Sequence, residues 1–319
     1  MNNRREVLKT LCAGAASLGA APLVDASSRL CAKADAVIFL WIPGGLPHTE
    51  TFDPKPHVAF KEGMPAREML TTWPSIPTAV TGIRFTQGLE QIASVMDRGA
   101  LIRSLVGASG PLLHAAHQRH WMEAGDEKHF GAALARQMGP RNTDAPAYVC
   151  IEDSDFASGC DYALAMIECG ARFIQVDYGY TPFEKWDTHE YGHRRLPALK
   201  RSIDAPVATL IRRLEARGLL ERTLVVLASE FSRAPLCEGS NATVSDERHF
   251  GLHAHFAGAG CVLLFGGGVR RGALFGRTAD THPSIVIENP VSVADVRATI
   301  AFALGLSAPE GAVIRGILS

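Results

Sequence analysis

Residues 34–42 read ADAVIFLWI, a continuous apolar run rich in the branched and aromatic residues that favour β-strands. A short run that is apolar on both faces, ended here by Pro43-Gly44-Gly45, is typical of a strand buried within a parallel sheet. The run TLVVLA at 223–228 has the same character, and four shorter runs fit further strands at 100–105, 147–151, 171–176 and 261–265. We therefore predict an α/β fold built on a mostly parallel sheet.

Segments with helical features alternate with these strands. Helices are predicted at 89–96, 131–138, 162–168, 199–214 and 291–304, and Pro206 predicts a kink or a late start in the fourth. This alternation places helices on both faces of the sheet, which gives a three-layer α/β/α sandwich. The proline-rich residues 54–82 are predicted to be a surface connection. Because there is no internal repeat or low-complexity linker, we expect residues 27–319 to form a single domain.

The N-terminus has the features of an export signal. Arg4-Arg5 precede an apolar run of small residues from Thr10 to Val24, and Ala26 is a plausible end of a cleavage site. The run is about 15 residues long, shorter than the roughly 20 that span a bilayer. We predict that residues 1–26 are a twin-arginine signal, with an amphipathic first helix as the alternative. The protein is then periplasmic or extracellular, without a stable membrane span.

Composition excludes several classes of protein. A formal net charge of −1, without acidic or basic runs, gives no electrostatic footprint for nucleic acid. The seven cysteines are spread along the chain without a CxxC pair, which argues against a dense disulfide framework and a closed cysteine zinc site. Three of them lie in apolar runs and are predicted core residues: Cys150, Cys169 and Cys261.

Polar groups follow several of the predicted strands. His48 and Glu50 follow the first, and Glu230 and Arg233 follow the strand at 223–228. The loop after 171–176 contains WDTHEYGHRR (186–195), with one carboxylate and two histidines in seven residues. The carboxyl ends of parallel strands meet at one edge of a sheet, where ligands collect. A histidine-rich loop at 249–255 enters the strand at 261–265 and must cross the same edge.

Carboxylates and imidazoles are the ligands of a divalent metal ion, with zinc, manganese, iron and calcium as candidates. The predicted ligands are Asp187, His189, His193, Glu230, His249 and His253, with His255 as a further candidate from the same loop.

Other roles for these residues remain open. Asp187 could instead cap the following helix, with solvated histidines beside it. Arg233 could pair with Glu230 or bind an anionic substrate through two hydrogen bonds. The helical triplet His114, His117 and His120 is predicted to be a solvated helix face.

Six segments together resemble the bacterial family known as domain of unknown function 1501, which is related to the alkaline phosphatase and sulfatase superfamily. They are GGLPHTETFDPKP (44–56), ALIRSLVGASGPLLHAAHQRHWMEAG (100–125), CGARFIQVDYG leading to WDTH (169–189), RGLLERTLVVLASEFSRAP (217–235), GGGVRRGALFG (266–276) and ENPVSVADVRATIAFALGL (288–306). The resemblance implies an alkaline-phosphatase-like sandwich with a two-metal site for phosphate or sulfate esters. Asp187 with His189 or His193 would serve one metal, and Glu230 would take the strand-end place of an Asp-His pair.

The chain departs from the catalytic relatives at three places. Residues 43–48 read PGGLPH where the relatives carry an Asp and a nearby nucleophile, which leaves Thr49 or Thr51 as the candidate nucleophile. Phe231 stands where a histidine ligand is expected. Between Asp155 and Gly159 the chain is shorter than longer members, so a substrate cap built from that insertion is missing.

Three functions follow from these observations. The first is an exported metal-dependent hydrolase of a small-molecule or glycan-borne anionic ester, with Thr49 as nucleophile and Arg233 as anion clamp. The second is a non-catalytic binding or accessory protein that retains a degenerate site. The third is a metal-supported structural domain of an envelope or polysaccharide-degrading complex.

Overall fold

A computed structural model describes residues 32–319 apart from 144, 153–154, 235–242, 252–253 and 309. Its main feature is a seven-stranded sheet. In spatial order the strands are β13 (Ala273–Phe275), β5 (Gly99–Ile102), β12 (Val262–Phe265), β8 (Thr223–Ala228), β1 (Ala36–Trp41), β7 (Phe173–Asp177) and β6 (Tyr148–Ile151).

The sheet is mostly parallel, as the sequence predicts. Strand β1 pairs in parallel with both β7 and β8, and all six of its residues are buried. Strand β12 runs antiparallel to β8 and β5, so it begins at the edge where the parallel strands end. The histidine-rich loop therefore reaches that edge, as predicted.

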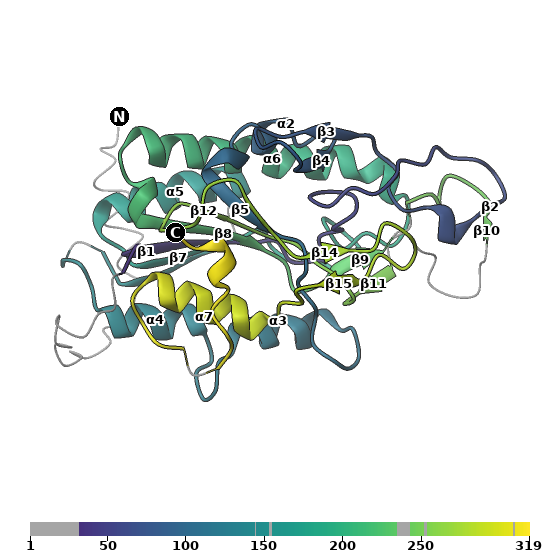
Figure 1. Cartoon of the computed structure of the whole chain (residues 1–319). Coiled ribbons are helices and arrows are strands. Elements are labelled where there is room, and N and C mark those ends of the chain that lie inside the picture. The colour runs from purple at the N-terminus through teal and green to yellow at the C-terminus, as the bar shows by residue number, and fades with distance from the viewer. Residues whose placement is uncertain (1–31, 144, 153–154, 235–242, 252–253, 309) are drawn as a thin grey trace.

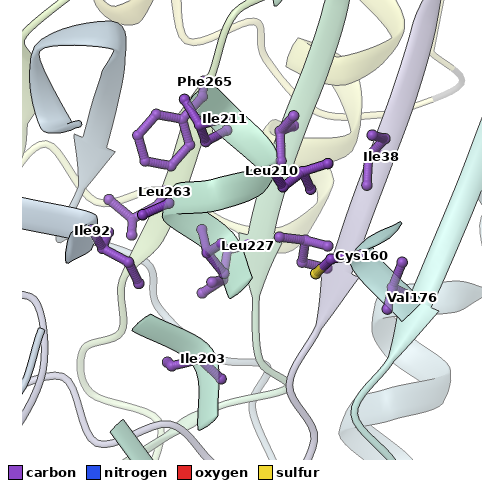
Figure 2. Close-up of a cluster of buried hydrophobic side chains, with 14 of the residues drawn as sticks. Ile38, Ile92, Cys160, Val176, Ile203, Leu210, Ile211, Leu227, Leu263 and Phe265 are labelled. Carbon is purple, nitrogen blue, oxygen red and sulfur yellow. The ribbon is translucent and has the colours of Figure 1, made fainter. Parts of the chain in front are cut away.

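Helices cover both faces of the sheet (Figure 1). One face carries α2 (Glu90–Ala93), α5 (Phe156–Cys169) and α6 (Gly192–Ala216), and the other carries α3 (His114–Met122), α4 (Phe130–Met138) and α7 (Val293–Ala303). Side chains alternate across a strand, so β1 contributes to two cores. Ile38 and Leu40 belong to the core beneath α5 and α6, part of which Figure 2 shows, and Phe39 and Trp41 belong to the other. The predicted three-layer α/β/α sandwich is confirmed.

Helix α6 differs from the prediction because it begins at Gly192 and includes both Pro197 and Pro206. The predicted late start is therefore wrong. The buried stripe continues across Pro206 through Ile203, Val207 and four further residues of the helix, so packing on the sheet offsets the cost of proline in a helix interior.

Cys150 is the second difference, because it is exposed and not part of a core. It lies on β6, the edge strand of the sheet, where burial is only partial. Cys261 is buried, as predicted, and Cys169 is partly buried and packs against the core beneath α6.

Four pairs of short strands lie outside the main sheet. They are β2 (Met64–Pro65) with β10 (Thr243–Val244), β3 (Ser75–Pro77) with β4 (Arg84–Thr86), β9 (Ser232–Ala234) with β11 (Ala254–Phe256), and β14 (Arg277–Thr278) with β15 (Val286–Glu288). Residues 54–82, predicted to be a surface connection, thus contain two strands and contribute Met64 and Met69 to a small third apolar cluster.

The predicted export signal lies outside the described residues. Within the part of the chain that is described, no helix has both the length and the apolar character needed to cross a bilayer.

Candidate metal centre

Four side chains from distant parts of the chain meet beyond the carboxyl ends of β7 and β8. Each offers one ligand atom, and these atoms all lie within 4.8 Å of one another. Helix α3 supplies the first residue, the loop after β7 supplies two, and β11 supplies the last. We call this group the His–Asp cluster; it consists of His114, Asp187, His189 and His255.

Asp187 holds the cluster together. Its Oδ1 atom lies 2.9 Å from His189 Nε2 and 3.1 Å from His114 Nε2. Its Oδ2 atom accepts hydrogen bonds from the Phe183 amide at 2.8 Å and the Tyr180 hydroxyl at 3.2 Å. Burial alone would raise the pKa of Asp187, but the hydrogen bonds to His114 and to the Phe183 amide, with the charges of Arg233 and His114, lower it well below its usual range. The carboxylate is therefore ionised at neutral pH.

The outer nitrogens of two cluster histidines are fixed by acceptors. His255 Nδ1 lies 2.7 Å from the carbonyl oxygen of Leu112, and His114 Nδ1 lies 2.5 Å from Oε1 of Glu230. A carbonyl oxygen or carboxylate only accepts, so each ring carries a proton on Nδ1. His255 then presents its Nε2 lone pair, and His114 does so in its neutral form. This outer hydrogen bond is a regular feature of metal-binding histidines.

The two inner nitrogens, His114 Nε2 and His255 Nε2, lie only 3.0 Å apart. Burial and the charges of Arg233 and His114 lower the pKa of His255 to about 4, so its inner lone pair is free of a proton at neutral pH. Burial lowers the pKa of His114 too, but hydrogen bonds to Asp187 and Glu230 outweigh it and the net pKa is raised. The raised pKa favours a proton on His114 Nε2, beside Asp187 and His255, and Arg233 Nη2 lies 3.2 Å from the same nitrogen. A metal ion bound here would take the place of that proton.

Glu230 supports the cluster from the end of β8. Its Oε1 atom also accepts the Gly44 amide at 2.8 Å, and Oε2 accepts the Ser229 hydroxyl at 2.9 Å. Gly44 has a φ of 114°, and a Cβ there would lie 2.6 Å from the backbone nitrogen of Asp187. A glycine is therefore required where the loop after β1 meets the loop that carries Asp187.

Arg233 pairs with Asp187 and not with Glu230, which corrects one of the sequence interpretations. The β9–β11 register places it opposite His255. It is fully buried and also donates to the carbonyl oxygens of Gly44 at 2.7 Å and Thr188 at 2.8 Å. To act as an anion clamp, Arg233 would have to exchange one of these partners for the substrate.

Among the described residues, three predicted ligands are not members of the cluster: His193, His249 and Glu230, the last of which contacts it through His114 Nδ1. The ring of His193 stacks on Trp73, with centroids 4.6 Å apart, and lines a separate cavity of about 550 Å³. Tyr191 has a φ of 53° and is the N-cap residue of α6, so the chain turns between His189 and His193 and separates them. His249 lies 3.0 Å from the Ser245 hydroxyl, in a surface turn. His253 lies outside the described residues.

His114 is the ligand candidate that the sequence interpretation missed. The predicted solvated face of α3 is wrong for His114 and His117, which are both buried, and correct for His120. The spacing of these histidines along the helix was visible, but the contact between His114 and Asp187 spans 73 residues and no local pattern encodes it. His255 was a candidate from its loop, and the β9–β11 pair brings it to the site.

Neither predicted nucleophile is hydrogen-bonded through its hydroxyl to a cluster residue within the described ranges. Thr49 is fully buried, and its hydroxyl makes no hydrogen bond within the described part of the chain. The Thr51 hydroxyl donates to the carbonyl oxygen of Pro47 at 2.7 Å. Phe231, which replaces an expected histidine, packs its ring 4.8 Å from the rings of both His114 and His255. It gives the cluster an apolar support.

Solved structures with the same architecture include murine ectonucleotide pyrophosphatase/phosphodiesterase 5 in complex with AMP. That structure is 10% identical, the match covers 90% of this chain and 100% of that one, and the TM-score is 0.51. The lipoteichoic acid synthase LtaP from Listeria monocytogenes is 9% identical, with coverage of 88% and 74% and a TM-score of 0.45. A protein of the alkaline phosphatase superfamily from Vibrio parahaemolyticus is 10% identical, with coverage of 97% and 76% and a TM-score of 0.44.

At 10% identity, the likeness to the murine phosphodiesterase structure shows a shared fold and no more, and the alkaline-phosphatase-like fold expected from the sequence is confirmed. A comparison with curated proteins gave no significant match. A family profile described as protein of unknown function (DUF1501) matches residues 34–155 and 152–310. The chain therefore belongs to the DUF1501 family, whose resemblance the sequence motifs already indicated.

Proposed function

We propose that this protein is an exported, metal-dependent hydrolase of phosphate or sulfate esters carried by small molecules or glycans. One observation carries the proposal: two histidines with outward-fixed Nδ1 atoms bring their Nε2 atoms within 3.0 Å of each other, beside an ionised aspartate. Such a donor set fits zinc or manganese. We propose that the bound ion is one of these two.

Each residue has a role in holding the ion and the substrate. His114, Asp187, His189 and His255 would hold the metal, which when bound would polarise the ester oxygen and stabilise the charge that develops there. Glu230 keeps the proton of His114 on Nδ1, and the Leu112 carbonyl does the same for His255. Arg233 keeps Asp187 ionised and oriented.

We propose water as the nucleophile. Neither Thr49 nor Thr51 is hydrogen-bonded to a cluster residue within the described ranges, and Thr49 is fully buried. The cluster meets solvent at His189 and His255, whose side chains are 21% and 20% exposed. Water and a small anionic ester can therefore approach the cluster from the side of these two rings.

The Arg233–Asp187 ion pair supports a second candidate function. The guanidinium already supplies a positive charge to the carboxylate, so the cluster can be stable without a metal. A non-catalytic binding or accessory protein with a degenerate site fits this arrangement.

We further propose that residues 27–319 form one domain, that residues 1–26 are the twin-arginine signal, and that the mature protein is periplasmic or extracellular.

Metal analysis and activity assays on the same preparations test the proposal. The purified protein is titrated with Zn²⁺ and Mn²⁺ by calorimetry and assayed on aryl phosphates and aryl sulfates. Near-stoichiometric binding and turnover are expected in the wild type, and both should be lost in Asp187→Asn and His255→Ala with the circular dichroism spectrum unchanged. Metal binding without turnover would establish the accessory function, and absence of both would overturn the metal site.

A further inference from the structure

Large apolar side chains are exposed beside the His–Asp cluster. Phe183 is 70% exposed, Leu113 62% and Tyr180 38%, although soluble proteins usually bury such side chains. All three are tied to cluster residues. Leu113 immediately precedes His114, while Tyr180 and Phe183 both donate hydrogen bonds to Asp187. An exposed apolar patch at a candidate active site indicates a binding surface.

The backbone holds Phe183 in this place at a cost. Its φ is 62°, in the left-handed region that residues with a side chain rarely adopt, and Lys185 two residues later has a φ of 46°. The Phe183 amide donates a hydrogen bond of 2.8 Å to Asp187 Oδ2, and the Phe183 ring lies 5.0 Å from the ring of His189, measured between centroids. The ring gains little from packing because most of it faces solvent. Strained residues of this kind cluster at ligand sites.

Tyr180 continues the same surface. Its ring lies 4.7 Å from the ring of His114, and its hydroxyl donates to Asp187 Oδ2. Phe183 contacts His189, which is one of the two cluster residues that reach solvent. A group bound at the cluster from the solvent side therefore lies close to two aromatic rings, one beside His114 and one beside His189.

We propose that Phe183, with Tyr180 and Leu113, binds the alcohol part of the ester, and that this part carries a flat apolar ring. The inference rests on the proposed hydrolase and specifies its substrate class. A flat ring can lie against the Phe183 ring with centroids about 4.5–7 Å apart, the range in which aromatic rings attract each other. A short alkyl alcohol has no such surface and gains much less.

The first arm of the test measures selectivity. The metal-loaded full chain is assayed on 2-naphthyl phosphate and sulfate and on the corresponding ethyl esters, as wild type, Phe183→Ala and Phe183→Trp. Phe183→Ala should lose about 10- to 100-fold in kcat/KM on the naphthyl esters, mainly through KM, and less than about threefold on the ethyl esters. Phe183→Trp should retain most of the preference. Tyr162→Ala, a 42% exposed aromatic on α5, is the matched control and should change neither.

The second arm measures binding without turnover. Calorimetry with 2-naphthol should show binding to the metal-loaded wild type and to Tyr162→Ala, and a loss of about tenfold or more in Phe183→Ala. If no ester is hydrolysed, the proposed function fails while this arm still decides the subsite.

Three results would overturn the inference. They are no naphthol binding by the wild type, equal binding by Phe183→Ala, and a naphthyl-to-ethyl preference that survives Phe183→Ala. A change in the oligomeric state of Phe183→Ala, seen by size-exclusion chromatography, would show that the ring contacts a second copy of the protein and would also refute it.

Discussion

Replacing Glu230 with glutamine should weaken metal binding without unfolding the protein. Glu230 is fully buried, and its Oε1 atom accepts the Nδ1 proton of His114 at 2.5 Å and the Gly44 amide at 2.8 Å. A glutamine side chain has the same shape, and its amide oxygen can accept both bonds. It lacks the negative charge that holds the proton on Nδ1 and makes Nε2 a stronger ligand.

The expected size of the effect follows from that hydrogen bond. A charge-assisted bond contributes about 1.5–3 kcal/mol and a neutral one about 0.5–1.5 kcal/mol, so the substitution loses about 1–1.5 kcal/mol. This corresponds to about tenfold in metal affinity. It lies at the lower end of the 10- to 100-fold range typical for the outer partner of a metal-binding histidine.

The assay is competition for Zn²⁺ against a chromophoric chelator at neutral pH, with thermal unfolding as a check on the fold. Ser229→Ala is the control, since the Ser229 hydroxyl bonds the other oxygen of Glu230, 2.9 Å away, and should change affinity less than about threefold. If folded Glu230→Gln binds zinc as tightly as the wild type, Glu230 does not control His114. Equal losses in the two variants would show that Glu230 acts only through packing.

Three further substitutions test the site and its support. His255→Ala should lower zinc affinity by more than about 100-fold, and His193→Ala should change it by less than about twofold. Both affinities are measured by the same competition assay. Equal losses would contradict the conclusion that His255 belongs to the cluster and His193 does not. Gly44→Ala should lower stability to urea by about 3 kcal/mol or more, because its Cβ meets the Asp187 backbone, and Gly63→Ala, with open space at its Cβ, should lower it less. Burial raises the pKa of Glu50 above its ordinary 4.5, although the charge of Lys200 opposes this, so the unfolded state ionises first as pH rises. The free energy of unfolding of the wild type, relative to that of Glu50→Gln, should therefore fall from pH 4.5 upwards and level off above the pKa of Glu50 in the folded protein. If this difference in unfolding free energy does not change with pH, the pKa of Glu50 is not raised.

The structure brings Asp187 and His189 into one cluster because both lie in one loop directly after a buried strand. His193 lies outside the cluster, because WDTHEYGHRR shows the residue types but not where the chain turns. That turn falls at Tyr191, whose left-handed conformation starts helix α6 and directs His193 onto Trp73. Residue spacing alone could not distinguish a ligand from a ring stacked in a neighbouring cavity.

The sequence by itself determined the sheet, the two helical layers and the family. The sheet and the helices follow from local runs of apolar residues. Each run shows the periodicity of a strand or a helix, and glycine and proline mark where it ends. The six residues of β1 are enough to predict a strand buried on both faces, and the structure buries all six.

Only the tertiary structure decided which side chains meet. His114 reaches Asp187 across 73 residues, and Arg233 pairs with that aspartate and not with its own neighbour Glu230. The β9–β11 pair brings His255 to the same point. Such contacts depend on the order of strands in the sheet and on backbone approaches such as that of Gly44 to Asp187, neither of which any local pattern encodes.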